Sequence, residues 1–570
     1  MENMDRRTFL KGGAGLAAGA ALLGAAGCAP STPAANDALA STAAGELPAD
    51  LKESDFEFSI VEREPITEFA AEETYDIVVV GAGCAGVPAV EEGAKVACLQ
   101  KEATVSANGN GCSFVVKAHS NPAGIVRWRS DWARLNDWRI NNELFNYYVE
   151  YAEEAVPWVI SQGRSVGIEP IEFLTDSSIR YDDGGVVAVC DATQASNQDL
   201  MVALAQKAAE GGATFYYETP CVQLVQEEDG TVTGAIGKQK DGSYVKLNAT
   251  KGVVLAAGDY MNNESMVDRN LRDAAMFPLC LVNHTGDGHI LGILAGGRMA
   301  PLGHARQIHT NYIGPFMFYP FLALDVHGKR FCNETIPMSS LNISMSATYK
   351  PEDRGIHFRI FDSKTEGAVE GIPGVPPVAL VGEGSAWMDP ETVVSGNTLE
   401  ELCDFMGMEE GVKANALAAV EKWNAAGDAG ADTEFGRDPE TMWPIKQGPF
   451  YGYPCGKRIG GGSLVATSGL LVTGRQQVQG QGFEPIKGLF ACGNNSGGRF
   501  PMGYNGIMNG VSIGMCLTLG MTLGEFLATG DLDAATTLGL NNAAPKQSAN
   551  GMGPGPMPGG DGAEGEGAPA

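Results

Sequence analysis

Between Thr74 and Lys101, two apolar runs are separated by a glycine turn and a helical pattern. This order predicts a strand, a glycine turn, a helix and a second strand. Ile77 to Val80 is a short, continuous, mostly β-branched run, which is typical of a strand buried in a parallel sheet. Ala89 to Ala94 has a short helical pattern, and Val96 to Leu99 is a second apolar run. The pattern therefore predicts one β-α-β unit.

Three glycines lie in the turn after the first predicted strand. Gly81, Gly83 and Gly86 have the spacing G-x-G-x-x-G. In a dinucleotide site, the first glycine allows the sharp turn, the second lets the backbone approach a pyrophosphate, and the third lets the helix pack on the strand. Because a strand precedes this turn and a helix and a strand follow it, the context predicts a dinucleotide site.

The residue after the second predicted strand departs from the usual pattern. An acidic side chain normally stands there and binds the ribose hydroxyls, but this chain has Gln100. A carboxamide still donates and accepts hydrogen bonds, so the interpretation keeps a ribose site at this position. Pro88 falls in the first turn of the helix, where a missing N–H does little harm.

Similar apolar runs recur far along the chain. Residues 211–237 contain two runs around the turn EEDGTV, which predicts a β-meander. Val253 to Ala256 predicts another buried strand, which ends at Ala257-Gly258. Residues 488–494 predict a strand entering a glycine turn, and residues 510–527 predict an apolar helix. These segments share the character of the first unit.

Other stretches have a different character. Residues 304–455 contain proline-rich loops and aromatic clusters but no dinucleotide pattern, which predicts an inserted substrate domain. Residues 541–570 have no Leu, Ile, Val, Phe, Tyr or Trp, so they are predicted to be disordered. Trp128, Trp132 and Leu135 share one face of a predicted helix, and burial explains such a face more often than stacking on a ligand.

Composition narrows the class of partner. Asp and Glu number 69 against 39 Lys and Arg, and the net charge of −30 excludes nucleic acid, because its phosphates would be repelled. The 570 residues are enough for several domains. None of the 12 cysteines forms C-x-x-C, so most are predicted to be small buried residues, with an iron–sulfur cluster built from distant cysteines as the alternative.

The N-terminus carries a targeting pattern. Arg6 and Arg7 precede a mild Gly/Ala/Leu run, which predicts a twin-arginine (Tat) signal over residues 1–28 and is too weakly apolar for a membrane span. Cys28 follows Ala-Ala-Gly, which resembles a lipobox and predicts a lipid anchor, with a chance cysteine as the alternative. The composition of residues 29–70 predicts a tether.

Six motifs follow one another in a characteristic order: GAGCAG, AAGD, HTGDGH, GKRFCNE, GGGS and GLFACGN. Together they resemble the FAD-dependent fumarate reductase/succinate dehydrogenase flavoprotein family, in its exported branch of urocanate reductases, 3-ketosteroid dehydrogenases and cardiac glycoside reductase-like flavoproteins. The resemblance covers about residues 75–530. It implies an α/β fold, with a Rossmann-like FAD-binding domain over 71–303 and 456–530 and an inserted α+β substrate (capping) domain over 304–455.

The resemblance also implies non-covalent FAD and assigns residues to each part of it. The implied contacts, by motif, are Gly81, Gly83 and Gly86 for the pyrophosphate, Gln100 and Lys101 for the adenosine ribose, Val222 for adenine, Asn110 and Gly111 for the isoalloxazine edge, Ala257, Gly258, Gly493 and Asn494 for the pyrophosphate and ribityl chain, and Ser512 and Ile513 for the pyrimidine ring. The last two would begin a helix, whose N-terminus stabilises negative charge on reduced flavin.

The family's clamp for a C4 dicarboxylate is largely missing. By motif counting, the proton-donating Arg of fumarate reductases falls on Met338, which cannot donate a proton, and the Arg that grips a carboxylate falls on Tyr504. The family's active-site His falls on Arg458, while His309 keeps a substrate-side His. The candidate catalytic residues are therefore Tyr504 first, then Arg458, His309 and Tyr319.

These features imply an exported reductase that is not a fumarate reductase. Reduced flavin would give hydride to an electron-poor C=C bond of a bulky, weakly charged substrate, such as a steroid-like enone, a cardenolide-type unsaturated lactone or an aryl-acrylate. A 3-ketosteroid-type dehydrogenase running in reverse and a flavin-binding electron-shuttle lipoprotein are the alternatives. The sequence shows no haem motif, so the implied electron donor is a separate membrane-bound cytochrome that oxidises quinol at the extracytoplasmic face.

Overall fold

The described part of the chain begins after the targeting segment. The structure is a computed structural model, and it describes residues 47–91, 94–109, 112–165, 179–180, 184–192, 197–272, 274, 283–301, 303–309, 321–335, 358–364, 393–454, 462–504 and 510–530. The predicted Tat signal, Cys28 and the predicted disordered tail 541–570 all lie outside the described residues. Everything described belongs to one compact unit, Leu47–Ala570.

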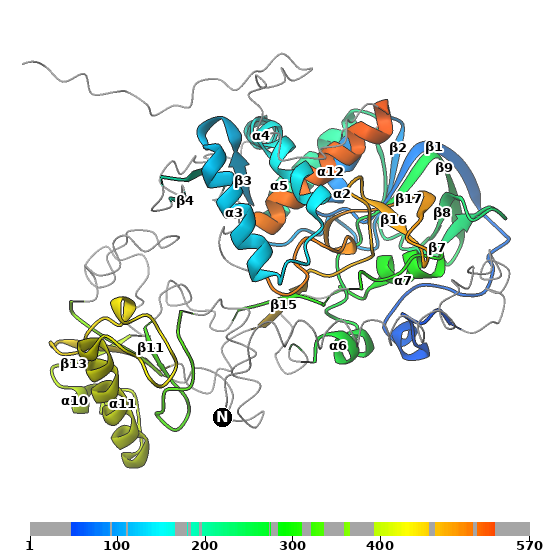
Figure 1. The fold of residues 1–570 in the computed structure, drawn as a ribbon. Helices are drawn as coiled ribbons and strands as arrows, with labels where there is room; N and C mark the ends of the chain where they lie inside the picture. Colours follow the sequence, from blue (N-terminus) through cyan, green and yellow to red (C-terminus); the bar gives the residue numbers. More distant parts are fainter. Residues whose placement is uncertain are drawn as a thin grey trace, which may run out of the picture. The chain divides into compact units, whose positions relative to one another are not determined.

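The largest sheet in the described residues has eight strands (Figure 1). Five of its strands are parallel and stand in the order β17-β9-β1-β2-β6. Ile77 pairs with Val96 on one side and with Gly252 on the other. The parallel strands are β1 (Ala71–Val80), β2 (Val96–Leu99), β6 (Thr214–Tyr216), β9 (Tyr244–Leu255) and β17 (Pro485–Ala491), and the short β16 (Gln477–Gln479) lies antiparallel beside β17.

The predicted meander is confirmed. β7 (Cys221–Gln226) pairs antiparallel with β8 (Val232–Lys238), and β8 pairs antiparallel with β9. The turn between β7 and β8 contains Gly230 with φ of +84°, a backbone conformation that favours glycine. This ribbon therefore branches from the parallel sheet at β9, the strand that the AAGD motif follows.

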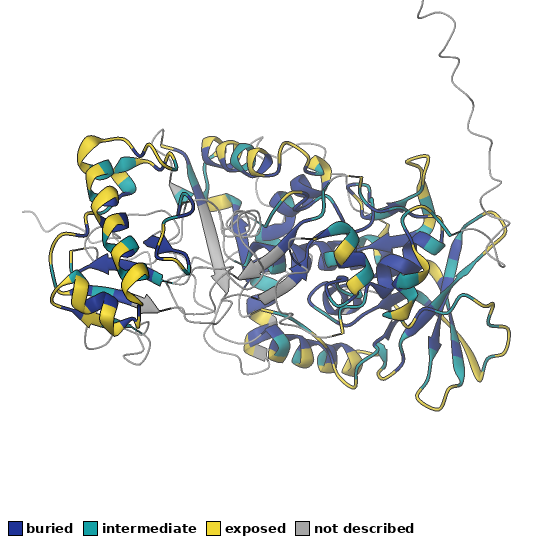
Figure 2. Ribbon diagram, turned by 90° about the horizontal axis from the view of Figure 1, so that it is seen from below, coloured by how far each residue is buried: buried dark blue, intermediate teal, exposed yellow. Residues whose placement is uncertain are grey.

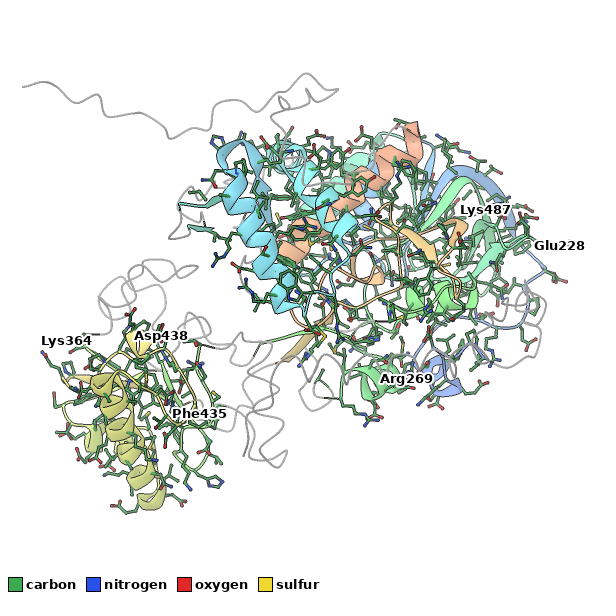
Figure 3. The ribbon with its side chains drawn as sticks, in the orientation of Figure 1. Glu228, Arg269, Lys364, Phe435, Asp438 and Lys487 are labelled. Atoms are coloured by element: carbon green, nitrogen blue, oxygen red, sulfur yellow. The ribbon has the colours of Figure 1, made fainter. Side chains whose placement is uncertain are left out.

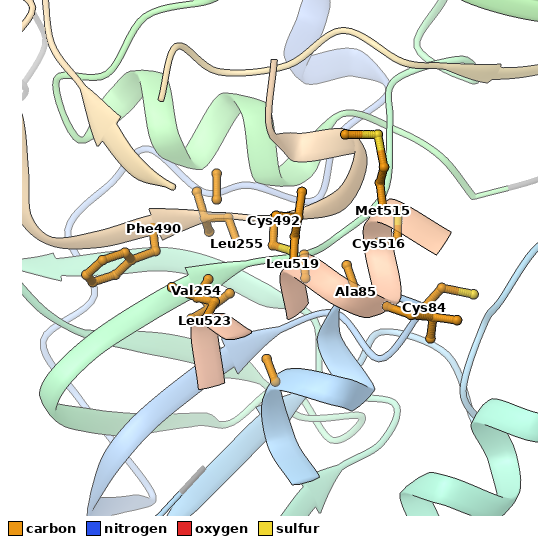
Figure 4. Packing of buried hydrophobic residues seen from close by; sticks show 14 of the residues in the cluster. Cys84, Ala85, Val254, Leu255, Phe490, Cys492, Met515, Cys516, Leu519 and Leu523 are labelled. Atoms are coloured by element: carbon orange, nitrogen blue, oxygen red, sulfur yellow. The ribbon is translucent and has the colours of Figure 1, made fainter. Parts of the chain in front are cut away.

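Helix α12 (Val511–Thr529) is the core helix of the unit, and it confirms the apolar helix predicted over 510–527. Its length and apolar composition would suffice for a membrane span, but 78% of the apolar window is buried inside the protein. Three glycines allow close packing: a Cβ would lie 1.8 Å from Ser113 O at Gly514, 2.4 Å from Ala85 O at Gly520 and 2.7 Å from Ala89 O at Gly524. Figure 4 shows this helix packed between α2 (Gly86–Glu91) and the ends of β9 and β17.

Further helices and a small sheet pack around α12 and the main sheet. Helix α2 begins at the third glycine of the turn, three residues earlier than the helical pattern Ala89 to Ala94 predicts. The remaining elements of this part are η2 (Glu53–Glu57), α2 (Gly86–Glu91), η3 (Lys117–His119), α3 (Pro122–Leu135), α4 (Asn142–Ser165), α5 (Asn197–Glu210), α6 (Glu264–Asn270), α7 (Asp287–Leu294), η9 (Gly493–Asn495), and the antiparallel sheet of β3 (Cys112–Val116), β5 (Val186–Ala192) and β4 (Ile179–Arg180).

Helix α3 buries the two tryptophans that the sequence places on one face. Trp128 and Trp132 are fully buried, with ring centroids 5.4 Å apart in an edge-to-face arrangement. Trp132 donates its indole N–H to the carbonyl of Arg499 at 3.1 Å. The prediction for Leu135 is wrong, because it is the last residue of the helix and its side chain is 39% exposed.

Part of the predicted tether packs on the main unit. Leu51 and Val61 are buried. Asp55 accepts two hydrogen bonds of 2.9 Å from the guanidinium of Arg269 on α6, which Figure 3 labels. Burial opposes ionisation of Asp55, but its hydrogen bonds from Arg269 and Ser265 outweigh this and hold its pKa below the usual range. Residues 47–66 are therefore anchored, unlike a free tether.

A second hydrophobic core lies within the segment predicted as a capping domain. It is built on a four-stranded antiparallel sheet, and Figure 2 shows its helices exposed on their outer side. The domain limits 304–455 stay a prediction. The elements are β11 (Leu322–Leu324), β12 (Phe358–Asp362), β14 (Phe450–Pro454) and β13 (Val394–Gly396) in sheet order, with α10 (Leu399–Phe405), α11 (Glu410–Ala429) and η8 (Pro439–Thr441).

The GKRFCNE motif serves the structure of this second core. Arg330 makes a bidentate pair with Glu334, at 2.9 and 3.0 Å, and also bonds Asp432. The guanidinium of Arg437 approaches Glu334 at 3.3 Å and lies over the ring of Trp423. These buried charges are paired with one another, as burial in a low dielectric requires.

Candidate functional site

Four parallel strands end at one edge of the main sheet. Their last residues are Ala491, Leu255, Val80 and Leu99, from β17, β9, β1 and β2. The chain leaves β1 toward β2 and β6, and later returns to β9 on the other side of β1. This reversal is a topological switch point, and α/β sheets bind ligands beyond the carboxyl ends of their strands at such a point.

The glycine turn lies at this edge, and its three glycines meet different surroundings. Gly81 has φ of +102°, and a Cβ there would lie 2.6 Å from the carbonyl oxygen of Ala256, the residue that follows β9. A Cβ at Gly86 would lie 1.9 Å from Gly81 O, so the helix start packs directly on the turn. At Gly83 a Cβ would meet only Ser106 O, at 3.0 Å. Packing thus demands Gly81 and Gly86, whereas Gly83 is less constrained by the protein itself.

Gln100 holds the glycine turn through hydrogen bonds to the protein backbone. Its side chain is buried; Oε1 accepts from the N–H of Ala82 at 3.1 Å, and Nε2 donates to Thr104 O at 2.8 Å. The neighbouring Lys101 donates to Thr285 Oγ1 at 2.9 Å and to Asp287 Oδ2 at 3.0 Å. Both residues lie at the predicted adenosine side, and their assignment to the ribose stays a prediction.

The carbonyl of Val222 accepts a hydrogen bond from the N–H of Glu62 at 3.0 Å. Glu62 belongs to the anchored N-terminal segment, and nearby Ser59 donates to Asp287 Oδ1 at 2.8 Å. A carbonyl oxygen has two lone pairs, so the predicted backbone contact of Val222 with adenine stays a prediction. The N-terminal segment therefore borders the region predicted for adenosine.

A buried asparagine and histidine fix the backbone that follows β9. Asn495 Oδ1 accepts from the N–H of Ala257 at 2.6 Å, and Asn495 Nδ2 lies 3.1 Å from His289 Nδ1. His289 Nε2 lies 3.2 Å from two carbonyl oxygens, those of Ser468 and Asn494. Burial lowers the pKa of His289, so the neutral ring donates from Nε2 and accepts at Nδ1. Sequence reasoning assigned no role to either side chain.

Beyond this clamp the chain turns at Gly258, which has φ of +82°. A Cβ at Gly258 would meet no other heavy atom within 4 Å. Ala257 and Gly258 are thus held at the sheet edge by the His289–Asn495 pair, with open space on the Cβ side of Gly258. This arrangement suits the backbone approach of a cofactor that the AAGD turn predicts.

Replacing Asn495 with alanine is expected to weaken FAD binding about 5- to 150-fold. Without the amide, the Ala257 N–H and a ring nitrogen of His289 lose the partner that fixes this turn, and ordering the turn when FAD binds would cost about 1–3 kcal/mol. Titration of the apoprotein with FAD measures the effect. Asn424→Ala is the matched control, because Asn424 bridges the backbone N–H and carbonyl of Ile445 in the second core; equal losses of FAD affinity in both variants would contradict the assignment.

An Asp–His pair lies close to the same turn. His284 Nδ1 is 2.6 Å from Asp259 Oδ2, and His284 Nε2 is 3.3 Å from Asn108 Nδ2. Burial disfavours the charged imidazole, but the carboxylate of Asp259 outweighs it and raises the pKa of His284. The motifs AAGD and HTGDGH carry these residues, and the sequence alone did not show that the motifs pair.

The turn after β17 joins the edge to the glycine loop. Gly493 has φ of +61°, and a Cβ there would lie 2.8 Å from Ala85 Cβ. Asn494 Oδ1 accepts from Arg499 Nη2 at 2.8 Å. Arg499 is 2% exposed, and sequence reasoning missed it, although a charged residue inside the apolar, glycine-rich run GGRFPMGYNG is an available signal.

Tyr504 lies at the start of α12. It is half-buried, and its ring centroid is 5.1 Å from that of Phe500. Burial raises the pKa of the Tyr504 hydroxyl to about 12, while the backbone N–H groups of Ser512 and Gly510 partly offset the rise. The candidate proton donor therefore shares this helix start with Ser512 and Ile513, the residues predicted to face the flavin.

The remaining candidate residues fall outside the described parts. These are Asn110, Gly111, Tyr319 and Arg458, and for His309 the backbone alone is described. His309 ends β10 (Arg306–His309), which pairs antiparallel with β15 (Gly462–Ala466). The register places His309 opposite Gly462, four residues along the chain from Arg458.

Comparison with known proteins assigns the family. Residues 76–511 match the FAD-binding domain family, and residues 3–22 match the twin-arginine translocation signal. A glycine turn at the switch point of a parallel sheet is typical of a dinucleotide-binding fold. The chain belongs to the FAD-binding family, it is an FAD-dependent oxidoreductase, and its Tat signal directs export.

Curated relatives span most of the chain at low identity. The chain is 24% identical to vinyl phenol reductase of Lactiplantibacillus plantarum over 80% of its own length and 97% of that protein. It is 25% identical to urocanate reductase of Eggerthella lenta, over 75% of this chain and 71% of that one. It is also 25% identical to digoxin reductase of Eggerthella lenta, over 79% of this chain and 84% of that one.

Solved structures confirm the fold class. A 3-ketosteroid-Δ4-(5α)-dehydrogenase from Rhodococcus jostii RHA1 superposes with a TM-score of 0.59, at 21% identity, over 81% of this chain and 98% of that chain. An open-conformation flavocytochrome c3 fumarate reductase gives a TM-score of 0.56, at 22% identity, over 81% of this chain and 80% of that one. The α/β fold with an FAD-binding domain is therefore as predicted.

The residues at the sheet edge fit FAD. Gly83 and Gly258 leave backbone accessible there, and the Nε of the buried Arg499 has no hydrogen-bond partner within the described residues. The turn at Gly81–Gly86 would hold the pyrophosphate, and the start of α12 would face the flavin ring. These individual contacts stay predictions.

Proposed function

We propose that this exported protein reduces an electron-poor C=C bond in a bulky, weakly charged substrate. The observation that carries the proposal is the place of Tyr504, a phenol beside the backbone N–H groups of Gly510 and Ser512 at the start of α12. At neutral pH this group holds a proton that it can donate. Motif counting places Tyr504 where fumarate reductases have a carboxylate-binding Arg, so the same position favours a carbonyl over a dicarboxylate.

The division of labour follows from these residues. The bound reduced flavin supplies hydride to the β-carbon of the alkene. Tyr504 orients the activating carbonyl or protonates the α-carbon, a contribution worth about 10²–10⁴-fold. Arg458, His309 and Tyr319 are the next candidates for the same proton. Asp259 and His284, which lie beside Asn108, border the turn that is predicted to line the pyrophosphate and ribityl chain.

The relatives support the substrate class. Vinyl phenol, urocanate and digoxin reductases are named for substrates of different shape, and one superposed dehydrogenase is in complex with 4-androstene-3,17-dione. At identities of 21–25% the urocanate, digoxin and androstenedione names support a range: a steroid-like enone, a cardenolide-type unsaturated lactone or an aryl-acrylate. A vinyl phenol carries no carbonyl on its alkene and lies outside this range. Anaerobic reoxidation of dithionite-reduced protein by a panel of such acceptors tests the proposal. Reoxidation by haem proteins and by no alkene would instead support an electron shuttle.

Fumarate is expected to be a very poor acceptor. Loss of one charged or hydrogen-bonding donor to the transition state costs about 2.7–4 kcal/mol, which lowers kcat 10²–10³-fold. By motif counting, this chain lacks both the family's proton-donating Arg, replaced by Met338, and its carboxylate-binding Arg, replaced by Tyr504. Stopped-flow reoxidation with fumarate measures this directly. Met338→Arg alone should not restore the reaction, and rapid fumarate turnover by the wild type would contradict the motif counting.

The electron donor and the membrane attachment are part of the same proposal. The Tat signal places the mature protein outside the cytoplasm, where a membrane-bound cytochrome that oxidises quinol is the fitting donor. Cys28, after Ala-Ala-Gly, would carry the lipid anchor that keeps the protein at this membrane. Mass spectrometry of the mature N-terminus tests the anchor.

A further inference from the structure

Arg499 is a buried cation with few partners. Its side chain lies on the loop between η9 and α12 and is 2% exposed. One nitrogen, Nη2, donates to Asn494 Oδ1 at 2.8 Å; Nη1 makes longer contacts of 3.5 Å with Ser512 O and 3.6 Å with Cys516 Sγ. Nε is buried and has no hydrogen-bond partner in the described part of the chain.

No carboxylate neutralises this charge within the described residues. Arg330 and Arg437, two buried arginines of the second core, both contact Glu334. Arg499 instead lies over the ring of Phe500, at 5.6 Å from its centroid, and bonds a neutral amide. A buried charge normally has a partner of opposite sign. This chain has a net charge of −30, so carboxylates are not scarce in it.

The position of Arg499 adds to the excess of positive charge around it. Ser512 and Cys516 belong to the first turns of α12, and the N-terminus of a helix carries a partial positive charge. Two sources of positive potential thus coincide at the sheet edge. The hydroxyl of Tyr504 feels this potential, because the charge of Arg499 offsets part of the rise in its pKa.

We infer that Arg499 supplies the fixed countercharge for the reduced, anionic form of the cofactor and thereby raises its reduction potential. The inference rests on FAD binding at this edge, as proposed above. Reduction by two electrons with uptake of one proton leaves the cofactor one unit more negative. The electrons come from the donor, and the guanidinium compensates the added charge without a second proton. Arg499 acts through the electrostatic field and takes part in no bond change.

The test is the midpoint potential of the bound FAD. Arg499→Gln is expected to weaken the preference for reduced over oxidised FAD at least tenfold, which lowers the potential by about 30 mV for a two-electron couple. Arg499→Lys retains the charge and should stay near the wild type. Arg475→Gln is the matched control. Arg475, like Arg499, lies over an aromatic ring, that of Phe526 on α12, but Arg475 is exposed to solvent.

The pH dependence gives a second readout that a merely structural role would not change. Uptake of one proton per two electrons gives a slope of about 30 mV per pH unit, and uptake of two protons gives twice that. The wild type should show the smaller slope, and Arg499→Gln should shift toward the larger one. Equal potentials and equal slopes in the two proteins would overturn the inference.

Asn494→Asp keeps the test decisive if Arg499→Gln does not fold. It places a carboxylate against Arg499 Nη2 at the position of the amide oxygen, 2.8 Å away, and so neutralises the cation internally. The potential should again fall by about 30 mV or more, and an unchanged potential would count against the countercharge. If no alkene reoxidises the reduced protein, the proposed substrate class is wrong, but the predicted shift in potential still stands. Failure of the proposed function and failure of this inference are therefore distinguishable.

Discussion

Replacement of Tyr504 by phenylalanine is expected to lower turnover of an electron-poor alkene by about 10²-fold or more, with FAD content unchanged. The change keeps the ring that packs on Phe500 and removes the hydroxyl alone. Because the pKa of this hydroxyl is raised to about 12, the wild-type group stays protonated throughout the neutral range. Its loss should therefore lower the rate without introducing a new pH dependence there.

A matched control separates proton donation from packing. Burial also raises the pKa of Tyr151 to about 12, but Tyr151 lies on α4 and stacks on Tyr147. Tyr151→Phe should leave turnover unchanged when both variants carry equal FAD. Near-wild-type turnover by Tyr504→Phe would show that the acid lies elsewhere, and Arg458 and then His309 would be the next residues to replace.

Gly83→Val is expected to abolish FAD binding while the protein stays folded. A Cβ at Gly83 meets only Ser106 O at 3.0 Å, a contact that a small shift relieves. The larger side chain would then stand where the backbone must approach the pyrophosphate. Flavin absorbance relative to protein absorbance after gel filtration measures occupancy, and circular dichroism reports the fold.

Two further glycines make this experiment specific. Gly411 lies on the exposed side of α11, where a Cβ meets nothing within 4 Å, so Gly411→Val should retain full FAD. Gly86→Ala should instead lower the folding stability, because its Cβ would lie 1.9 Å from Gly81 O. Full FAD content in Gly83→Val would contradict the placement of the pyrophosphate at this turn.

Several elements could be predicted from short segments because their causes are local. The bounds of β2, Val96–Leu99, coincide with those of the apolar run, and α12 matches its apolar pattern within two residues at its C-terminal end. The glycine turn was recognisable because the sharp turn and the close packing that require glycine there involve residues only a few positions apart. Export followed from Arg6 and Arg7, which a translocation signal match confirms.

Other predictions depended on where a helix ends or on contacts between residues far apart in the chain, and sequence patterns define both poorly. Leu135 fits the apolar face of α3 by its spacing, but the helix ends there and the side chain is exposed. Residues 47–66 have the composition of a tether, yet Asp55 is held by Arg269, which follows it by 214 residues. Such long-range pairs leave no periodic signal in a single sequence.

The sequence by itself determined the class of this protein: an exported, FAD-dependent α/β oxidoreductase. The tertiary structure alone decided which distant residues meet at the sheet edge. It joined His289 to Asn495 and Asp259 to His284, and it left Arg499 without a carboxylate among the described residues. The reason is physical. Backbone geometry and hydrophobic period act between neighbours in the chain, whereas burial and electrostatic pairing depend on neighbours in space.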